Sequence, residues 1–455
     1  MPLFAAHIND AGITLVRGER IVYREPGFAL LDETLHTGNE AFSRSRIDPR
    51  RIQHRYWASL GTEPLPVQGF SHLTPADLAS RQLEEMWRKA GESRAELVLA
   101  VPAYMQPANL SLLLGIARAL ELPVAAMVDG AVAATRREYR NAVPVHIDIS
   151  LHAAMLTRIA QPGRARFERV EVLEDCGLYA LYDAWLTAVA EAFVRQSRFD
   201  PLHTAESEQA LLDNLASWLA EASRSERVSM TLPYEGAEYQ AEIESLTLVA
   251  AAAPVYQRIA SSLRALFRAE DYPAIQLTDR IARLPGLAEM LKARVGGEVF
   301  ALEPGATARG ALARHRDESR GGEAVRLKRQ LPWDRGAVEV ARDETARRPA
   351  GVPTHLLLGS RAWAIAEVPL VVGSQADGEA RAIPLGAEMP GVSRRHCTVR
   401  YLNGQAVLED HSRYGTFLNG HRIDGSTVLQ VGDAVRVGSP GYEFRLITTD
   451  ESHGA

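Results

Sequence analysis

The stretch PVHIDISLHAAMLTRI, Pro144–Ile159, has the pattern of two strands joined by a short turn, with one acid, Asp148, near the end of the first strand. A turn in this position binds phosphate when it is built of glycines, because backbone N–H groups can then approach the oxygens closely. Here the turn reads Ser150-Leu151-His152. The stretch therefore has the form of a nucleotide-site hairpin without the glycines that would hold a nucleotide.

The composition is that of a soluble globular protein and excludes several other classes. The 455 residues are 46% hydrophobic and 24% charged, with a net charge of −6, so no global field favours nucleic acid or an anionic membrane. The most apolar run, Leu246–Val255, is shorter than the roughly 18 residues of a membrane span. The first ten residues lack a signal-peptide pattern. We therefore expect a cytoplasmic protein without membrane insertion or a nucleic-acid partner.

The two cysteines, Cys176 and Cys397, lie far apart in the sequence and have no metal-ligand or redox spacing. Two reduced thiols in a cytosolic protein are the simplest interpretation.

Segment patterns divide the chain into four parts. From 1 to 313, strand-like and helix-like runs alternate, which predicts an α/β domain. The segment 314–353 holds mixed charges and few large apolar residues, which predicts a flexible linker; a nucleic-acid-binding tail is the weaker alternative. The part from 354 to 448 has many short strand-like runs separated by turn residues, as in a β-sandwich. Residues 449–455 remain as a C-terminal tail.

Three motifs in the β-rich part form a recognisable series: VSRRHC (Val392–Cys397), SRYGTFLNG (Ser412–Gly420) and VLQVGDAVRVG (Val428–Gly438). Together they resemble the forkhead-associated (FHA) domain, over residues 354–448. The resemblance implies an all-β sandwich that binds phosphothreonine peptides. Loops at one end of such a sandwich can bring hydroxyls, a guanidinium and backbone amides together around a phosphate.

The FHA resemblance also implies roles for individual residues. Ser393 and Thr416 would supply hydroxyls to the phosphate, and Arg394 or Arg413 would supply positive charge. Asn419 would hold the peptide backbone. Three further positions would have structural roles, the histidine as a loop brace rather than a catalytic group: Gly373, His396 and Gly415.

One position departs from the family pattern. Ser374 follows Gly373 where the family usually has an arginine. Losing one charge-assisted contact costs about 1.5–3 kcal/mol, or roughly tenfold to a hundredfold in affinity. Arg381 or the Arg394-Arg395 pair would have to compensate. The alternative is an FHA domain that binds a protein partner without phosphate.

A second ordered series lies in the first 313 residues. HINDAGITLVRGERIVYREPG (7–27), the strand and helix block at 98–134, the helices and hairpin at 198–243, and LTDRIARLPGLAEMLKARVGG (277–297) resemble, in this order, blocks of the actin-like and DnaK-type (heat-shock chaperone) ATPases. The resemblance implies a two-lobed α/β fold of duplicated ribonuclease-H-like domains, with Mg²⁺ and ATP bound between the lobes.

The nucleotide contacts of that family are replaced here. The first phosphate hairpin reads Asn9-Asp10-Ala11-Gly12, the second keeps its acid but loses its glycines, and Thr278-Asp279-Arg280 stands at the adenosine glycine pair. Side chains at such positions crowd the phosphates, and a non-glycine residue with positive φ is disfavoured. We therefore expect a pseudo-ATPase with no catalytic residue, cofactor or metal. The degenerate nucleotide site comprises Asn9, Asp10, Gly12, Asp148, Ser150, His152 and Asp279.

Two functional hypotheses follow. The first is a non-catalytic adaptor whose actin-like body mediates assembly, including self-association, and whose FHA domain recruits a protein partner. The alternative is a Mg-ATP-binding or ATP-hydrolysing enzyme regulated through its FHA domain, with Asp10 and Asp148 organising the metal; an unhydrolysed nucleotide or another small ligand in the cleft is a third case. We favour Asp148 as a strand-end acid over a magnesium ligand, and His152 as a packed side chain over a metal ligand.

Overall fold

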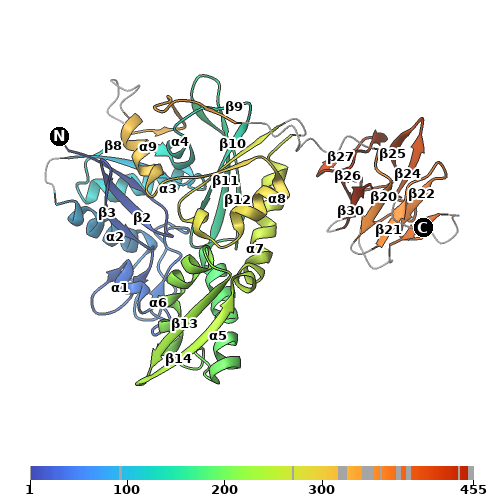
Figure 1. Ribbon diagram of the computed structural model, residues 1–455. Helices are drawn as coiled ribbons and strands as arrows, with labels where there is room; N and C mark the ends of the chain where they lie inside the picture. The colour runs from blue at the N-terminus through green and yellow to red at the C-terminus, as the bar shows by residue number, and fades with distance from the viewer. Residues whose placement is uncertain are drawn as a thin grey trace. The chain divides into compact units, whose positions relative to one another are not determined.

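A computed structural model of the chain is shown in Figure 1. Its residues form two units, Met1–Ala341 and Arg342–Ala455. The first is α/β and the second is all β. The predicted tail, 449–455, lies outside the residues that the structure describes, which are 2–91, 95–268, 271–315, 325–340, 352–358, 361–375, 381–385, 391–438 and 441–448.

The first half of the α/β unit is built on a six-stranded sheet with the order β17-β8-β7-β1-β2-β3. Three strands run antiparallel, β1 (Leu3–His7), β2 (Ile13–Arg17) and β3 (Arg20–Glu25). Two parallel strands follow on the other side of β1, namely β7 (Glu96–Val101) and β8 (Val124–Asp129).

The second half repeats this topology in a sheet with the order β16-β15-β10-β11-β12-β18. Strands β10 (Val143–Ile149), β11 (Ala153–Ala160) and β12 (Ala165–Glu174) are antiparallel. Strands β15 (Pro273–Leu277) and β16 (Glu298–Ala301) add in parallel beside β10. The α/β unit is therefore an architectural duplication, and the stretch Pro144–Ile159 opens its second copy.

Helices and smaller strands complete the unit at places that the sequence marks. α3 begins at Pro107, and proline is favoured in the first turn of a helix. The hairpin of β13 and β14 turns at Glu235-Gly236, and both residues have positive φ, 49° and 81°, as a two-residue turn of this kind requires. It packs against the long helices α5 and α6 (Figure 1). The bounds are α1 (Asn39–Phe42), α2 (Pro75–Ala90), α3 (Pro107–Ala119), α4 (Gly130–Ala134), α5 (Leu178–Ser197), α6 (Ala205–Ala222), α7 (Ser245–Ala265), α8 (Leu287–Val295), α9 (Ala306–Arg314), the 3-10 turn η1 (Ile281–Arg283), β4 (Ala29–Leu30), β5 (His36–Thr37), β6 (Ile52–Gln53), β13 (Arg227–Tyr234) and β14 (Ala237–Glu244).

The predicted flexible linker, 314–353, is wrong for residues 325–340. In that segment β17 (Leu327–Lys328) pairs with β8, β18 (Gln330–Leu331) pairs with β12, and β19 (Val338–Glu339) pairs with β9 (Tyr139–Arg140). Isolated apolar side chains among the charges explain the difference, since Leu331 and Val340 are each only 2% exposed. The segment joins the edges of both sheets. Residues 316–324 and 341–351 of the predicted linker lie outside the described ranges.

The second unit is a β-sandwich, as predicted. Its sheets have the orders β21-β20-β30-β29-β26-β27 and β23-β22-β24-β25-β28. Alternate side chains from both sheets fill one core, which includes Val372, Val399 and Phe444. The strands are β20 (His355–Leu358), β21 (Arg361–Ala364), β22 (Leu370–Gly373), β23 (Ala382–Pro384), β24 (Cys397–Leu402), β25 (Gln405–Asp410), β26 (Thr416–Leu418), β27 (His421–Arg422), β28 (Ser426–Val428), β29 (Ala434–Val437) and β30 (Tyr442–Ile447).

No helix within the described ranges combines the length and the apolar character that crossing a membrane requires.

Candidate functional site

His396 connects two loops at one end of the sandwich. Its side chain is fully buried, its Nδ1 accepts a hydrogen bond from the backbone N–H of Ser393 at 3.1 Å, and its Nε2 lies 3.4 Å from the carbonyl oxygen of Gly415. Because Nδ1 is an acceptor, the ring proton is on Nε2 and points to Gly415. Burial lowers the pKa of His396. The neutral imidazole is therefore a brace between the two loops.

Gly373 lies under the same loop. A Cβ at this position would overlap the carbonyl oxygen of Arg394. The backbone N–H of Ser374 donates to the carbonyl of Ser393 at 3.1 Å. The strand end at Gly373 and the loop that begins at Ser393 are thus in direct backbone contact, which only glycine allows.

Three of the predicted phosphate contacts lie together on these loops. The Oγ of Ser393 accepts a hydrogen bond from the backbone N–H of Arg413 at 3.2 Å, so its own proton remains to be donated. The side chains of Arg394 and Arg413 are exposed. We call Ser393, Arg394 and Arg413 together the loop cluster.

Thr416 and Asn419 make hydrogen bonds inside the domain. Thr416 is fully buried, and its hydroxyl donates to Asp410 at 2.7 Å. The amide of Asn419 donates to Asp433 at 2.8 Å and accepts from the backbone N–H of Ala434 at 2.9 Å. Both side chains therefore have partners inside the domain, and their contacts to phosphate or peptide remain predictions. Asp410 lies just before the motif at 412–420, and Asp433 lies in the motif at 428–438.

The structure reduces the number of arginines that could replace the one usually found at the position of Ser374. Arg381 donates to the carbonyl oxygens of Val368 and Ala364, which removes it as a replacement for the missing arginine. The two arginines of the loop cluster, Arg394 and Arg413, are exposed.

Tyr414 is a surface residue that sequence reasoning missed. It is 62% exposed, and the guanidinium of Arg413 lies 5.7 Å from its ring centroid. The sequence could have indicated this contact, because Arg413 and Tyr414 are neighbours in a turn and an arginine beside an aromatic ring can form a cation–π interaction.

In the α/β unit, Asp148 lies at the centre of a closed polar network. It accepts hydrogen bonds from Asn9 at 2.7 Å, from Thr278 at 3.0 Å and from the backbone N–H of Ile149 at 2.9 Å, and His7 Nε2 is 3.2 Å away. Burial by itself would raise the pKa of Asp148, but the hydrogen bond from His7 and the charge of Arg280 lower it below its ordinary value. Protein donors thus surround the carboxylate that in a nucleotide site would face a metal.

Asp279 and Arg280, which follow β15, reach back to the first hairpin. Arg280 donates to the carbonyl of Gly12 at 2.9 Å, and Asp279 pairs with Arg24 at 2.7 Å. The Nη1 of Arg280 and the Oδ2 of Asp10 are both buried with no hydrogen-bond partner in the described structure. Burial raises the pKa of Asp10 to about 6. A guanidinium from the second half therefore occupies the entrance between the hairpins.

The turn of the second hairpin is packed rather than open. Leu151 is buried in a small apolar cluster that includes Phe28. His152 lies against His54, with 3.0 Å between the ring nitrogens and 4.9 Å between the ring centroids. The first backbone N–H groups of α5 donate to the carbonyls of Ser150 and Leu151 at 3.0 and 2.9 Å. The side chains of Leu151 and His152 and the N-terminus of α5 therefore surround the turn at which the sequence suggested phosphate contacts.

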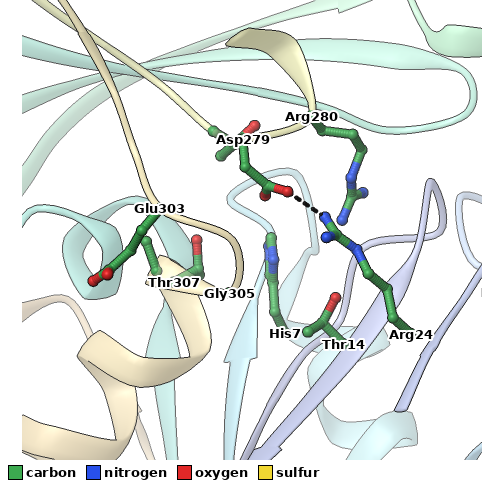
Figure 2. A pocket seen from close by; sticks show the side chains of 10 residues that line it. His7, Thr14, Arg24, Asp279, Arg280, Glu303, Gly305 and Thr307 are labelled. Carbon is green, nitrogen blue, oxygen red and sulfur yellow. Dashed lines mark hydrogen bonds and ion pairs between the residues drawn. The ribbon is translucent and has the colours of Figure 1, made fainter. Parts of the chain in front are cut away.

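The cavity that remains here is small. Figure 2 shows Asp279 and Arg280 pointing toward Arg24, with His7 and Thr14 below and α9 on the other side. Its volume is about 10 Å³, near the minimum of roughly 10–15 Å³ for one water, whereas small-molecule sites occupy roughly 300–1,000 Å³. Among the residues described, no group of three or more His, Cys, Asp or Glu side chains could hold a metal ion.

Comparison with known proteins identifies the second unit. The family model of the FHA domain matches residues 370–438, which contain the loop cluster, His396 and Gly373. No curated protein matches the chain. The C-terminal sandwich, with its histidine-braced loops, is an FHA domain.

Proposed function

We propose that this protein is an adaptor that recruits a phosphothreonine-bearing partner through the loop cluster of its FHA domain. The observation that carries the proposal is the Ser393 hydroxyl. Its proton has no acceptor within the described ranges, it accepts from the backbone N–H of Arg413, and both Arg394 and Arg413 are exposed. A hydroxyl donor and guanidinium donors form charge-assisted hydrogen bonds to phosphate. The brace by His396 fixes the loops before binding, which lowers the entropic cost of binding.

Quantitative binding of phosphopeptides to the full chain tests this proposal. A threonine-phosphorylated peptide pool should bind, and Ser393→Ala should weaken binding roughly tenfold, since a hydrogen bond to a charged group contributes about 1.5–3 kcal/mol. Ser426→Ala, at an exposed serine of β28, is the matched control and should bind like the wild type. Equal affinity for phosphorylated and unphosphorylated forms of the selected peptide would refute the phosphate requirement.

For the α/β unit we propose an actin-like pseudo-ATPase that provides a rigid body for protein assembly. The repeated sheet topology supports the fold assignment. The loss of ATPase activity is supported by the packed turn at Leu151, by the saturated Asp148 and by the Arg280 side chain between the hairpins. The body and the FHA domain would then combine two protein contacts in one chain, and avidity would exceed either affinity alone.

A further inference from the structure

A second cavity in the α/β unit has a different character from the closed cleft. Its volume is about 230 Å³, and it lies where the segment after α4, the end of β16, the start of α9 and the chain near residue 335 come together. Three arginines and two aromatic residues are among the side chains that line it: Arg136, Arg137, Arg335, Tyr139 and Phe300.

Two of the arginines form a fixed wall. Arg136 makes a two-pronged ion pair with Asp334, and Arg335 donates to Glu303 at 2.7 Å. Glu303, the acid that lines the cavity, is also 3.3 Å from Arg309. Its charge is therefore compensated, and it does not set the sign of the cavity.

Arg137 is the cation that remains. No hydrogen bond or ion pair of its side chain is found in the part of the chain that the structure describes, and it is only partly exposed. The hydroxyl of Tyr139 likewise has no hydrogen-bond partner there. Burial raises the pKa of Tyr139 to about 12, against the opposing charges of Arg137 and Arg335. The phenol thus stays a neutral donor near two guanidiniums.

The apolar part of the wall is an aromatic pair. Tyr139 and Phe300 meet edge to face, with 4.8 Å between ring centroids. A cavity of about 150 Å³ holds benzene, so 230 Å³ leaves room for a ring and one substituent. The Arg137 guanidinium and the Tyr139 hydroxyl line the same cavity and can both donate hydrogen bonds, so the cavity favours a substituent that is an anion.

We propose that this cavity binds a small molecule with a planar ring and one phosphate or carboxylate group, whose anionic group is bound by Arg137 and the Tyr139 hydroxyl and whose ring lies against Phe300. The site is separate from the loop cluster of the FHA domain and does not depend on phosphopeptide binding.

Calorimetry and hydrogen exchange on the full chain test the proposal, with phenyl phosphate and benzoate as the two anionic probes and benzyl alcohol as the neutral one. At least one anion should bind and protect backbone amides at 137–142 and 300–303, and benzyl alcohol should bind more weakly. Arg137→Gln should weaken binding about tenfold, and Tyr139→Phe should weaken it by a smaller factor. Since no hydrogen bond or ion pair of the Arg137 side chain is found among the described residues, this variant should fold normally.

One control locates the binding. Arg88→Gln, at an exposed arginine on α2, should leave the affinity unchanged. The proposal is overturned if neither anion binds, if Arg137→Gln binds like the wild type, or if protection appears only at residues 393–413, which would assign the anion to the FHA loops.

Discussion

Gly373 shows how a single residue sets the geometry of the FHA loops. Any side chain there would overlap the Arg394 carbonyl, so Gly373→Ala must displace the loop that carries Ser393. We expect the FHA unit to lose about 1–3 kcal/mol of stability, the usual cost of overpacking, together with phosphopeptide affinity. Calorimetric unfolding checks this, with Gly115→Ala as the control, since its Cβ would meet open space. Unchanged unfolding of the FHA unit would show that the loop contact is not required.

The role of an FHA residue could be predicted where its contacts lie within one motif. It could not be predicted where the contacts come from another part of the domain. The FHA resemblance implied that His396 braces the loops, and the structure has its Nδ1 accepting from the backbone N–H of Ser393. The burial of Thr416 and the amide bonds of Asn419 depend on Asp410 and Asp433. Asp410 ends β25 and Asp433 lies in the turn before β29, so the motif around Thr416 and Asn419 does not by itself show which of its polar atoms have partners inside the domain.

At the scale of elements, the turn between β10 and β11 is joined to the first half of the unit by a histidine pair. Burial lowers the pKa of His54 to about 4, with further contributions from His152, Arg55 and Arg46, and burial also lowers the pKa of His152, which Asp175 partly opposes. A histidine with a lowered pKa binds fewer protons in the folded than in the unfolded state. Its contribution to stability is therefore complete above about pH 6.5 and is lost as the pH falls toward 4.

We accordingly expect the α/β unit to unfold at lower urea concentration at pH 5 than at pH 7.5. His54→Gln should reduce this difference, because the variant cannot take up the proton at that position. His203→Gln, at an exposed histidine, should leave it unchanged. An unaltered pH difference in His54→Gln would contradict the role of the pair.

Helix starts and turns can be predicted where single residues such as proline and glycine specify them. Pro107 marks the start of α3, and Glu235-Gly236 marks a two-residue turn. The short strands in 325–340 were missed because their apolar residues are isolated, and each strand is stabilised by pairing with a distant edge rather than by its own pattern.

At the scale of the whole molecule, the segment 325–340 belongs to the α/β unit. Leu331→Ala should therefore destabilise that unit by about 2–4 kcal/mol, as core truncations do. Leu246→Ala, at a side chain that is 76% exposed, should cost little. Chemical denaturation of the full chain measures both. Equal stability of the two variants would restore the interpretation of this segment as a linker.

The molecule thus combines an FHA domain with an α/β body in which side chains fill the space between the β1–β2 and β10–β11 hairpins. The two-part organisation and the absence of glycine from the turn at 150–152 were visible in the sequence, because both depend on local motifs. The closure by Arg280 was not, since it joins a turn of the second half to Gly12 in the first.

Titration of the full chain with Mg-ATP, followed by thermal unfolding, tests the filled cleft most directly. The account predicts no shift in the unfolding of the α/β unit at millimolar nucleotide. A bound ligand at a hundred times its dissociation constant would add about 2.7 kcal/mol. A stabilisation of that size, abolished by Asp148→Ala, would contradict the account.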